Sequence, residues 1–171
     1  MKKAISLFII TLTIFFCQAQ EFKALDEKNG FRDYKFGIPT EEISNLKLVE
    51  ASKDSLTKVY SKTDDKKQIG EYDVENIYYS FYKNKLSFIL LKTKGYLNSR
   101  GVLNVLVSLY GNGFQSNKYI EEYYWLGKVV TLSYKENSIN NNATIIIQNN
   151  EIQNEKEADK SVKDKKATKD F

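Results

Sequence analysis

The sequence predicts an α+β fold in which an antiparallel sheet carries helices on one face. Two segments of alternating apolar and polar residues, 77–82 and 86–93, flank the short turn Lys83-Asn84-Lys85 and predict a β-hairpin. Apolar residues then recur three and four positions apart from Val102 to Tyr110, which predicts an amphipathic helix. Further β-rich runs follow. Strands joined by short turns favour antiparallel pairing, with the helices covering one face.

The chain is long enough for one domain with its own core. It has 171 residues, of which 42% are hydrophobic and 28% charged. This balance excludes a bundle of membrane-spanning helices, and the many aromatic and branched residues exclude a disordered or collagen-like chain. We expect an α+β domain at 31–150, preceded by a lead-in at 20–30 and followed by a charged helix or tail at 151–171.

The first nineteen residues have the pattern of an export signal. Lys2 and Lys3 precede an apolar run from Ala4 to Phe16, which is too short to span a bilayer core. Cys17-Gln18-Ala19 then places small residues where a signal peptidase requires them. We expect cleavage after Ala19, a mature chain starting at Gln20, and a location in the periplasm or outside the cell.

Two alternatives for this segment stay open. The signal could remain uncleaved as an anchor, or Cys17 could carry a lipid. Lipoprotein signals resemble one another in having Gly, Ala or Ser before that Cys, whereas Phe16 stands here. Cleavage is therefore the preferred prediction, and it leaves no membrane span in the mature chain.

The residues that remain after cleavage exclude several chemistries. Met1 and Cys17 are the only Met and Cys and leave with the signal, and the chain has no His. Disulfides are excluded, as are zinc, haem, copper and iron–sulfur sites built on Cys, His or Met. His-based triads and Cys nucleophiles are excluded as well. We expect no cofactor and no metal.

The basic residues do not predict a nucleic-acid surface. Without Lys2 and Lys3 the chain has 24 basic and 22 acidic residues, and only Arg32 and Arg100 are arginines. Nucleic-acid surfaces are typically clustered and rich in Arg, whereas the Lys residues here are scattered among acids. No nucleic-acid partner is expected.

The first elements are predicted from start signals and alternation. Residues 20–30 are mixed and polar, which is typical of a loose start, and Phe31–Gly37 alternates like a short strand or extended segment. Pro39 and the acids after it predict a short helix from Pro39 to about Leu46. Leu56–Thr63 is rich in β-formers, and Glu71–Val74 opens a further strand.

The second half of the domain repeats this order of elements. The central helix is expected to begin at a cap formed by Asn98 or Ser99 and to end at Gly111. Strands are predicted at 123–126, 128–135 and 143–148. The order helix, strands, helix, strands is consistent with two helix-plus-meander units.

The C-terminal segment 151–171 is highly charged. Twelve of its 21 residues are charged, six acidic and six Lys. Such a segment can form a solvated helix with paired charges, but its apolar face is too small to dock firmly. A tail that reaches a partner is the alternative interpretation.

Aromatic residues gather in the predicted strands and give the candidate binding residues Tyr78, Tyr82, Tyr124 and Trp125. In a sheet with helices on one face, alternate residues of each strand face water. Tyr or Trp at such positions anchors protein interfaces and sugar platforms. The alternative is that these rings pack the sheet itself, because strands select aromatic residues.

Adjacent carboxylates are a second feature, and they occur at Glu41/Glu42, Asp64/Asp65 and Glu121/Glu122. Neighbouring residues on a helix or strand point apart, so an acid–base pair would need two carboxylates from separate elements. A small carboxylate-dependent hydrolase is therefore the alternative function.

Short motifs spread over residues 31–148 resemble those of a known group of exported modules. Phe31–Ile43 has a Phe-Arg lead, an aromatic-Gly step and two Glu at a helix start, and Leu109-Tyr110-Gly111 and Trp125-Leu126-Gly127 precede the late strands. The pattern is similar to small α+β modules related to the β-lactamase inhibitory protein and to small outer-membrane assembly lipoproteins. The resemblance implies a binding or inhibitory module that recognises an envelope protein or cell-surface polymer without catalysis.

Overall fold

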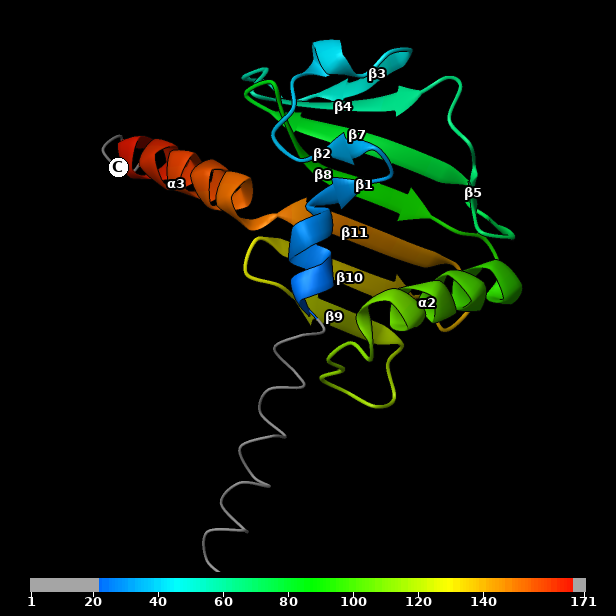
Figure 1. Ribbon diagram of the computed structural model, residues 1–171. Helices are drawn as coiled ribbons and strands as arrows, with labels where there is room; N and C mark the ends of the chain where they lie inside the picture. The colour runs from blue at the N-terminus through cyan, green and yellow to red at the C-terminus, as the bar shows by residue number, and fades with distance from the viewer. Residues whose placement is uncertain (1–21, 168–171) are drawn as a thin grey trace, which may run out of the picture.

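A seven-stranded antiparallel sheet forms the centre of the protein. The computed structural model describes residues 22–167 (Figure 1). The strand order is β3-β4-β7-β8-β11-β10-β9, and every neighbouring pair is antiparallel. The predicted fold class, an antiparallel sheet with helices packed against it, is confirmed. The predicted signal at 1–19, with Cys17, lies outside the described residues.

The strands of this sheet are β3 (Leu46–Ala51), β4 (Thr57–Lys62), β7 (Asn76–Tyr82), β8 (Lys85–Lys92), β9 (Glu122–Leu126), β10 (Val130–Glu136) and β11 (Ala143–Asn149). Two small hairpins lie beside it, β1 (Gly30–Phe31) with β2 (Tyr34–Lys35) and β5 (Gln68–Ile69) with β6 (Tyr72–Asp73). The helical elements are residues 22–28, the 3-10 turn η1 (Thr40–Glu42), α2 (Tyr96–Tyr110) and α3 (Asn150–Ala167).

Two meanders make up the sheet, and the separate β5–β6 hairpin interrupts the first between β4 and β7. β3, β4, β7 and β8 form the first, and β9, β10 and β11 form the second. They join where β8 pairs with β11, with Leu91 opposite Ile145. Residues 22–28 form a helix before the first meander and α2 precedes the second, so each meander follows a helix.

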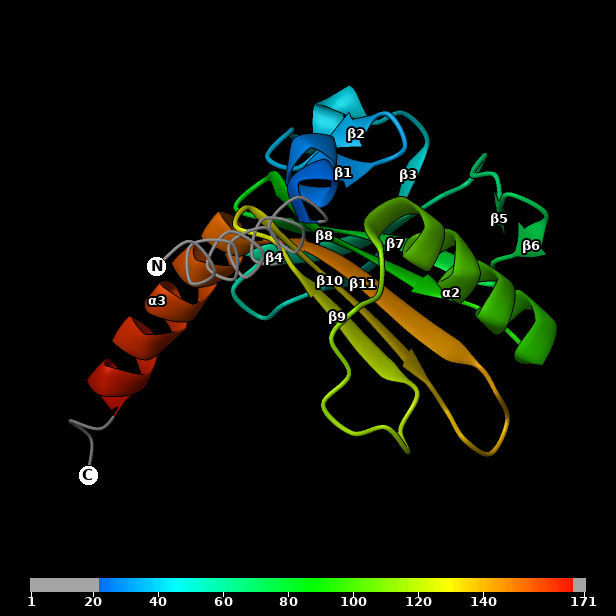
Figure 2. The ribbon, with the colours of Figure 1, turned by 60° about the horizontal axis from the view of Figure 1, so that its bottom comes forward.

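The core lies on one side of the sheet. Figure 2 shows residues 22–28, the β1–β2 hairpin and α2 on that side, and α3 on the other. Side chains alternate between the two faces along each strand, so every second residue reaches the core. One buried row crosses five strands in register and consists of Tyr79, Ile89, Ile147, Leu132 and Trp125.

The hairpin predicted around Lys83-Asn84-Lys85 is confirmed. β7 and β8 pair from Tyr82 and Lys85 at the turn. Lys83 and Asn84 form the two-residue connection, with φ angles of 48° and 63°. Two-residue turns with positive φ at both positions match the right-handed twist of the flanking strands.

The helix predicted from Pro39 to Leu46 is wrong. Only the 3-10 turn Thr40–Glu42 forms, and the chain then enters the edge strand β3 at Leu46. Asn45 has a φ of 62°, and its carbonyl accepts the Thr63 N–H at 3.0 Å. The left-handed residue ends the helical path, and the hydrogen bond to Thr63 aligns β3 beside β4.

The cap of the central helix lies three residues before Asn98 and four before Ser99, the two predicted caps. It runs from Tyr96, with Gly95 as the capping residue. Ser99 is unavailable as a cap because its hydroxyl lies 2.7 Å from the Thr93 hydroxyl and donates to the Asn141 carbonyl at 2.6 Å. The end at Gly111 is confirmed, and its φ of 75° is a positive value that glycine adopts without strain.

The expectation of a loose start at residues 20–30 is wrong for the part that the structure describes. Residues 22–28 are helical, and Leu25 lies fully in the core. The Asp26 carboxylate accepts hydrogen bonds from the backbone N–H groups of Lys128, Val129 and Val130, at 2.8–2.9 Å. This side chain therefore ties the start of the chain to the turn between β9 and β10.

The charged C-terminal segment is a helix, and its first half docks on the sheet. Asn149 caps α3 by accepting the Ile152 N–H at 3.0 Å, and Ile152 is buried. Glu155 pairs with Lys83 at 3.0 Å and with Lys85 at 3.2 Å. The expected helix is confirmed, and ion pairs to the β7–β8 hairpin supplement its small apolar face.

We expect Asp26→Ala to lower the free energy of unfolding by about 3 kcal/mol, because three backbone N–H groups lose a charged acceptor. Urea unfolding followed by circular dichroism measures the change. Asp33→Ala is the matched control on an exposed carboxylate of the β1–β2 turn, and it should stay within about 0.5 kcal/mol of the parent protein. A loss below about 1 kcal/mol in Asp26→Ala would contradict the proposed tie.

Candidate functional site

The sheet face opposite the core carries a continuous row of partly exposed side chains. Tyr78 pairs with Leu90, Leu90 with Ile146, Ile146 with Ser133, and Ser133 with Tyr124. The row crosses five strands spaced about 4.8 Å apart, so it is roughly 20 Å long. All five side chains are of intermediate exposure. We call this row and its two neighbouring rows the open face.

The two neighbouring rows differ, because one is mixed and the other is polar and charged. On one side, Phe88, Gln148, Thr131 and Leu126 lie in register. On the other side lie Asn76, Lys92, Thr144, Lys135 and Glu122. Protein interfaces typically combine an apolar centre with a polar rim, and the open face has such a rim on the side of Lys92 and Lys135.

The α3 helix borders the open face at the β7–β8 end (Figure 2). The Tyr82 hydroxyl donates a hydrogen bond to Asp159, and the Lys156 ammonium lies 6.0 Å from the centre of the Phe88 ring. Burial and the bond to Asp159 raise the pKa of Tyr82 to about 12. On this side of the sheet Tyr82 and Ser80 are buried, whereas the row from Tyr78 to Tyr124 stays partly exposed.

Both edges of the sheet are modified in ways that oppose pairing with another strand. On β3 the register shifts between Leu48 and Glu50, which marks a β-bulge. On β9 the Tyr124 backbone exchanges hydrogen bonds of 2.7 and 2.9 Å with Phe114 in the preceding loop. Bulges and covering loops are common protections of edge strands. The bulge and the bridge therefore leave the open face as the more accessible surface of this sheet.

The structure separates the four predicted binding residues. Tyr78 and Tyr124 lie on the open face as expected. Tyr82 lies on the same side but is only 3% exposed, because α3 covers it. Trp125 is wrongly placed by the prediction, since it is 0% exposed on the core side and its indole N–H donates to the Gly111 carbonyl at 2.9 Å. Adjacent strand residues face opposite ways, so Tyr124 and Trp125 cannot share a face.

Sequence reasoning missed the aliphatic part of the open face. Leu90 and Ile146 lie between the two tyrosines, on the central strands β8 and β11. Both strands are apolar on both sides, as Leu90-Leu91 and Ile145-Ile146-Ile147 show. That continuous apolar character was the available signal, because it predicts a central strand with two apolar faces.

The adjacent carboxylates Glu121 and Glu122 point apart as predicted. Glu122 pairs with Lys135 at 3.0 Å on the open face. Glu121 lies 2.8 Å from Arg100 Nη1, and Arg100 Nε lies 2.9 Å from Glu136. Arg100 holds the pKa of the Glu121 carboxyl below its usual range. The arginine thus ties α2 to β10 and to the residue before β9, and this cluster is a structural link.

One cavity brings carboxylates from separate elements together. It has a volume of about 210 Å³ beside α3 and is lined by Asp54 and Asp159. Hydrogen bonds from Lys163 to Asp54 and from Lys83 to Asp159 hold the pKa of both carboxyl groups below their usual range. A carboxylic acid that donates a proton near neutral pH needs the opposite shift. The cavity therefore lends no support to the alternative of a small hydrolase.

In residues 22–167 no group of three or more Asp or Glu side chains is placed to hold a metal ion. No helix within that part of the chain is long and apolar enough to cross a membrane.

Comparison with protein-family models, curated proteins and solved structures gave no match. The resemblance to small exported inhibitory and assembly modules therefore stays an expectation from short sequence motifs.

We expect α3 to loosen from the sheet in acid. The pKa values of Glu155 and Asp159 lie below their ordinary 4.5 and 3.8, mainly because Lys83 hydrogen-bonds to both. Groups with a lowered folded pKa stabilise above the ordinary pKa and lose this effect as the pH falls through the folded value. Hydrogen exchange measured by NMR should therefore show that the backbone amides of α3 are protected at pH 6. At pH 3 they should lose most of this protection relative to the amides of β10.

The Lys83→Gln variant should weaken α3 protection at pH 6, because both carboxylates lose their shared cation. Lys118→Gln is the control, since Lys118 is exposed in the loop before β9. Raised salt should act in the same direction as Lys83→Gln because exposed ion pairs are screened. Equal protection of α3 at pH 6 and pH 3 would contradict docking by charge.

Proposed function

We propose that this chain is an exported binding module that recognises another protein of the cell envelope through the open face. The observation that carries the proposal is the row of Tyr78, Leu90, Ile146, Ser133 and Tyr124 on a sheet face that no helix covers along this row. Such a row costs hydration free energy unless a partner covers it.

The composition of the row favours a protein partner over a polysaccharide. Leu90 and Ile146 separate the two tyrosines, so the centre of the row is aliphatic. Sugar platforms need exposed ring faces and hydrogen-bond donors for hydroxyl groups, whereas a protein partner can cover aliphatic side chains with its own. A cell-surface polymer is the second partner class that the sequence suggests.

Two further observations support a binding role. The edges of the sheet are protected by a bulge and by the Phe114 bridge, which leaves the face as the available surface. The motifs within Phe31–Ile43 and near Trp125 resemble modules that bind or inhibit other proteins. Binding without catalysis is therefore the function that the described residues support best.

We expect the double variant Tyr78→Ala/Tyr124→Ala to reduce capture of the partner from native envelope extract at least tenfold. The reason is that aromatic anchors carry a large share of interface energy. Stability should fall by only about 1 kcal/mol, because both rings are partly exposed. Quantitative mass spectrometry of the captured protein and urea unfolding provide the two measurements.

Tyr96→Ala/Tyr119→Ala is the matched control, since it removes two exposed tyrosines outside the open face. It should leave capture unchanged. Equal capture by the open-face variant and the parent protein would sink the proposal, and so would a loss of several kcal/mol in stability, which would assign Tyr78 and Tyr124 to packing.

Export is tested independently of binding. Lys2, Lys3, the apolar run Ala4–Phe16 and the small residues before Gln20 support it. Intact-mass measurement of the protein from its natural host should give a chain that begins at Gln20. A chain that retains Met1 would contradict export by a cleaved signal, and a diacylglycerol mass on Cys17 would show lipid attachment instead.

A further inference from the structure

The apolar side of α2 is wider than its contact with the sheet. Val102, Leu103 and Leu106 are buried. Val105 is only partly buried, and Leu109 is 59% exposed although it continues the same stripe. These two residues lie on the flank of α2 that borders a cavity, so this flank is apolar where no protein element covers it.

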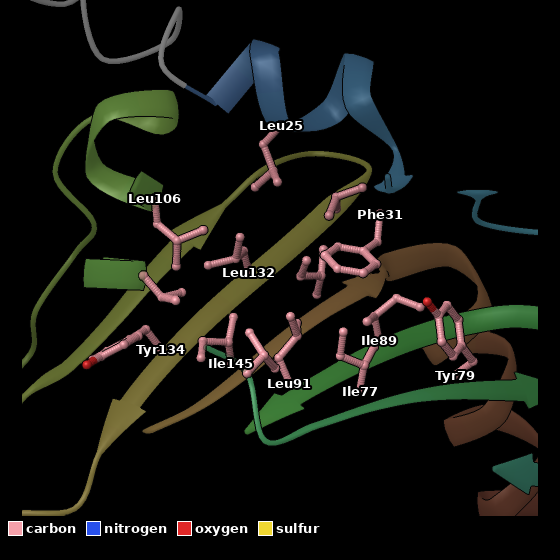
Figure 3. Packing of buried hydrophobic residues seen from close by; sticks show 14 of the residues in the cluster. Leu25, Phe31, Ile77, Tyr79, Ile89, Leu91, Leu106, Leu132, Tyr134 and Ile145 are labelled. Carbon is pink, nitrogen blue, oxygen red and sulfur yellow. The ribbon is translucent and has the colours of Figure 1, made fainter. Parts of the chain in front are cut away.

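The cavity has a volume of about 180 Å³ and lies on the core side of the sheet. Leu132 and Ile145 contribute to its floor, α2 forms one wall, and Phe31 belongs to the opposite wall. Figure 3 shows Leu106 and Phe31 on opposite sides of this space, with Leu132 and Ile145 between and below them. Most of the side chains that line the cavity are aliphatic or aromatic.

The only charged residues that line the cavity are Lys28 and Arg32. No carboxylate of the described residues lines it. The Lys28 ammonium donates to the Arg32 backbone carbonyl, which is a neutral acceptor, while the Arg32 guanidinium pairs with Asp65. Lys28 therefore offers a positive charge at the rim of an apolar cavity, with no described carboxylate bonded to it.

We propose that this cavity binds a small single-chain anionic amphiphile, with its hydrocarbon chain along Val105 and Leu109 and its carboxylate at Lys28. This goes beyond the proposed function, because the cavity and the open face lie on opposite sides of the sheet. The volume of the cavity favours a short or medium hydrocarbon chain, since an apolar cavity of about 150 Å³ is large enough for benzene. The charge at the rim selects a carboxylate over a neutral or cationic head group.

Isothermal titration with octanoate, octanol and octyltrimethylammonium tests the head group. Octanoate should bind with a stoichiometry of one and at least tenfold more tightly than octanol, and the cation should bind most weakly. Affinity should rise about fourfold for each added methylene in the carboxylate series and level off once the cavity is full. Lys28→Gln should bring octanoate to the affinity of octanol, and Lys23→Gln on the same helix is the control.

Substitutions that fill the cavity with a larger side chain test whether octanoate binds there. Val105→Phe should weaken octanoate at least tenfold, and Ser108→Phe, which adds the same ring to the exposed side of α2, should not. Leu109→Trp gives a second filling variant at an exposed position if Val105→Phe unfolds the protein. The proposal is overturned if octanoate binds both filling variants as it binds the parent protein, if octanol equals octanoate, or if several molecules bind without saturation.

Discussion

The pairing of β8 with β11 is the interaction on which both faces of this protein depend. It places Leu91 opposite Ile145 on the core side and Leu90 opposite Ile146 on the other. The two meanders are each local in sequence, and this one pairing joins them into a single sheet. Both the buried row and the open face cross this boundary without a break in register. Without the pairing, the core would split, and neither row would cross five strands.

Much of this architecture could be predicted from local patterns. The β7–β8 hairpin follows from alternation on both sides of two turn residues, and the end of α2 follows from Gly111 after an apolar stripe. The mistakes have a common physical origin. The segment Pro39–Leu46 has helix start signals, but Asn45 hydrogen-bonds to Thr63, a residue far along the chain, and that tertiary contact decides the conformation. Local propensity is easily overridden by such contacts.

The candidate site illustrates the same limit. Tyr78 and Tyr124 follow from alternation, because each is surrounded by residues of the opposite face. Trp125 could have been assigned to the core by applying that alternation to its neighbour. The burial of Tyr82 could not be predicted in this way. It depends on α3 and on the hydrogen bond to Asp159, which is distant in the sequence. Charge pairing between distant elements carries no local sequence signal, so the docking of α3 was not predictable from residues 151–171 alone.

The protected edges of the sheet also govern how one copy of the chain meets another. A regular, uncovered outer strand can serve as a template on which further chains add, and the result is a growing fibre. The bulge at Leu48 and the Phe114 bridge remove regular templates at β3 and β9. Crowded copies of this protein therefore encounter one another as closed units. A surface rich in tyrosine and aliphatic residues can then remain available without promoting stacked-strand aggregation.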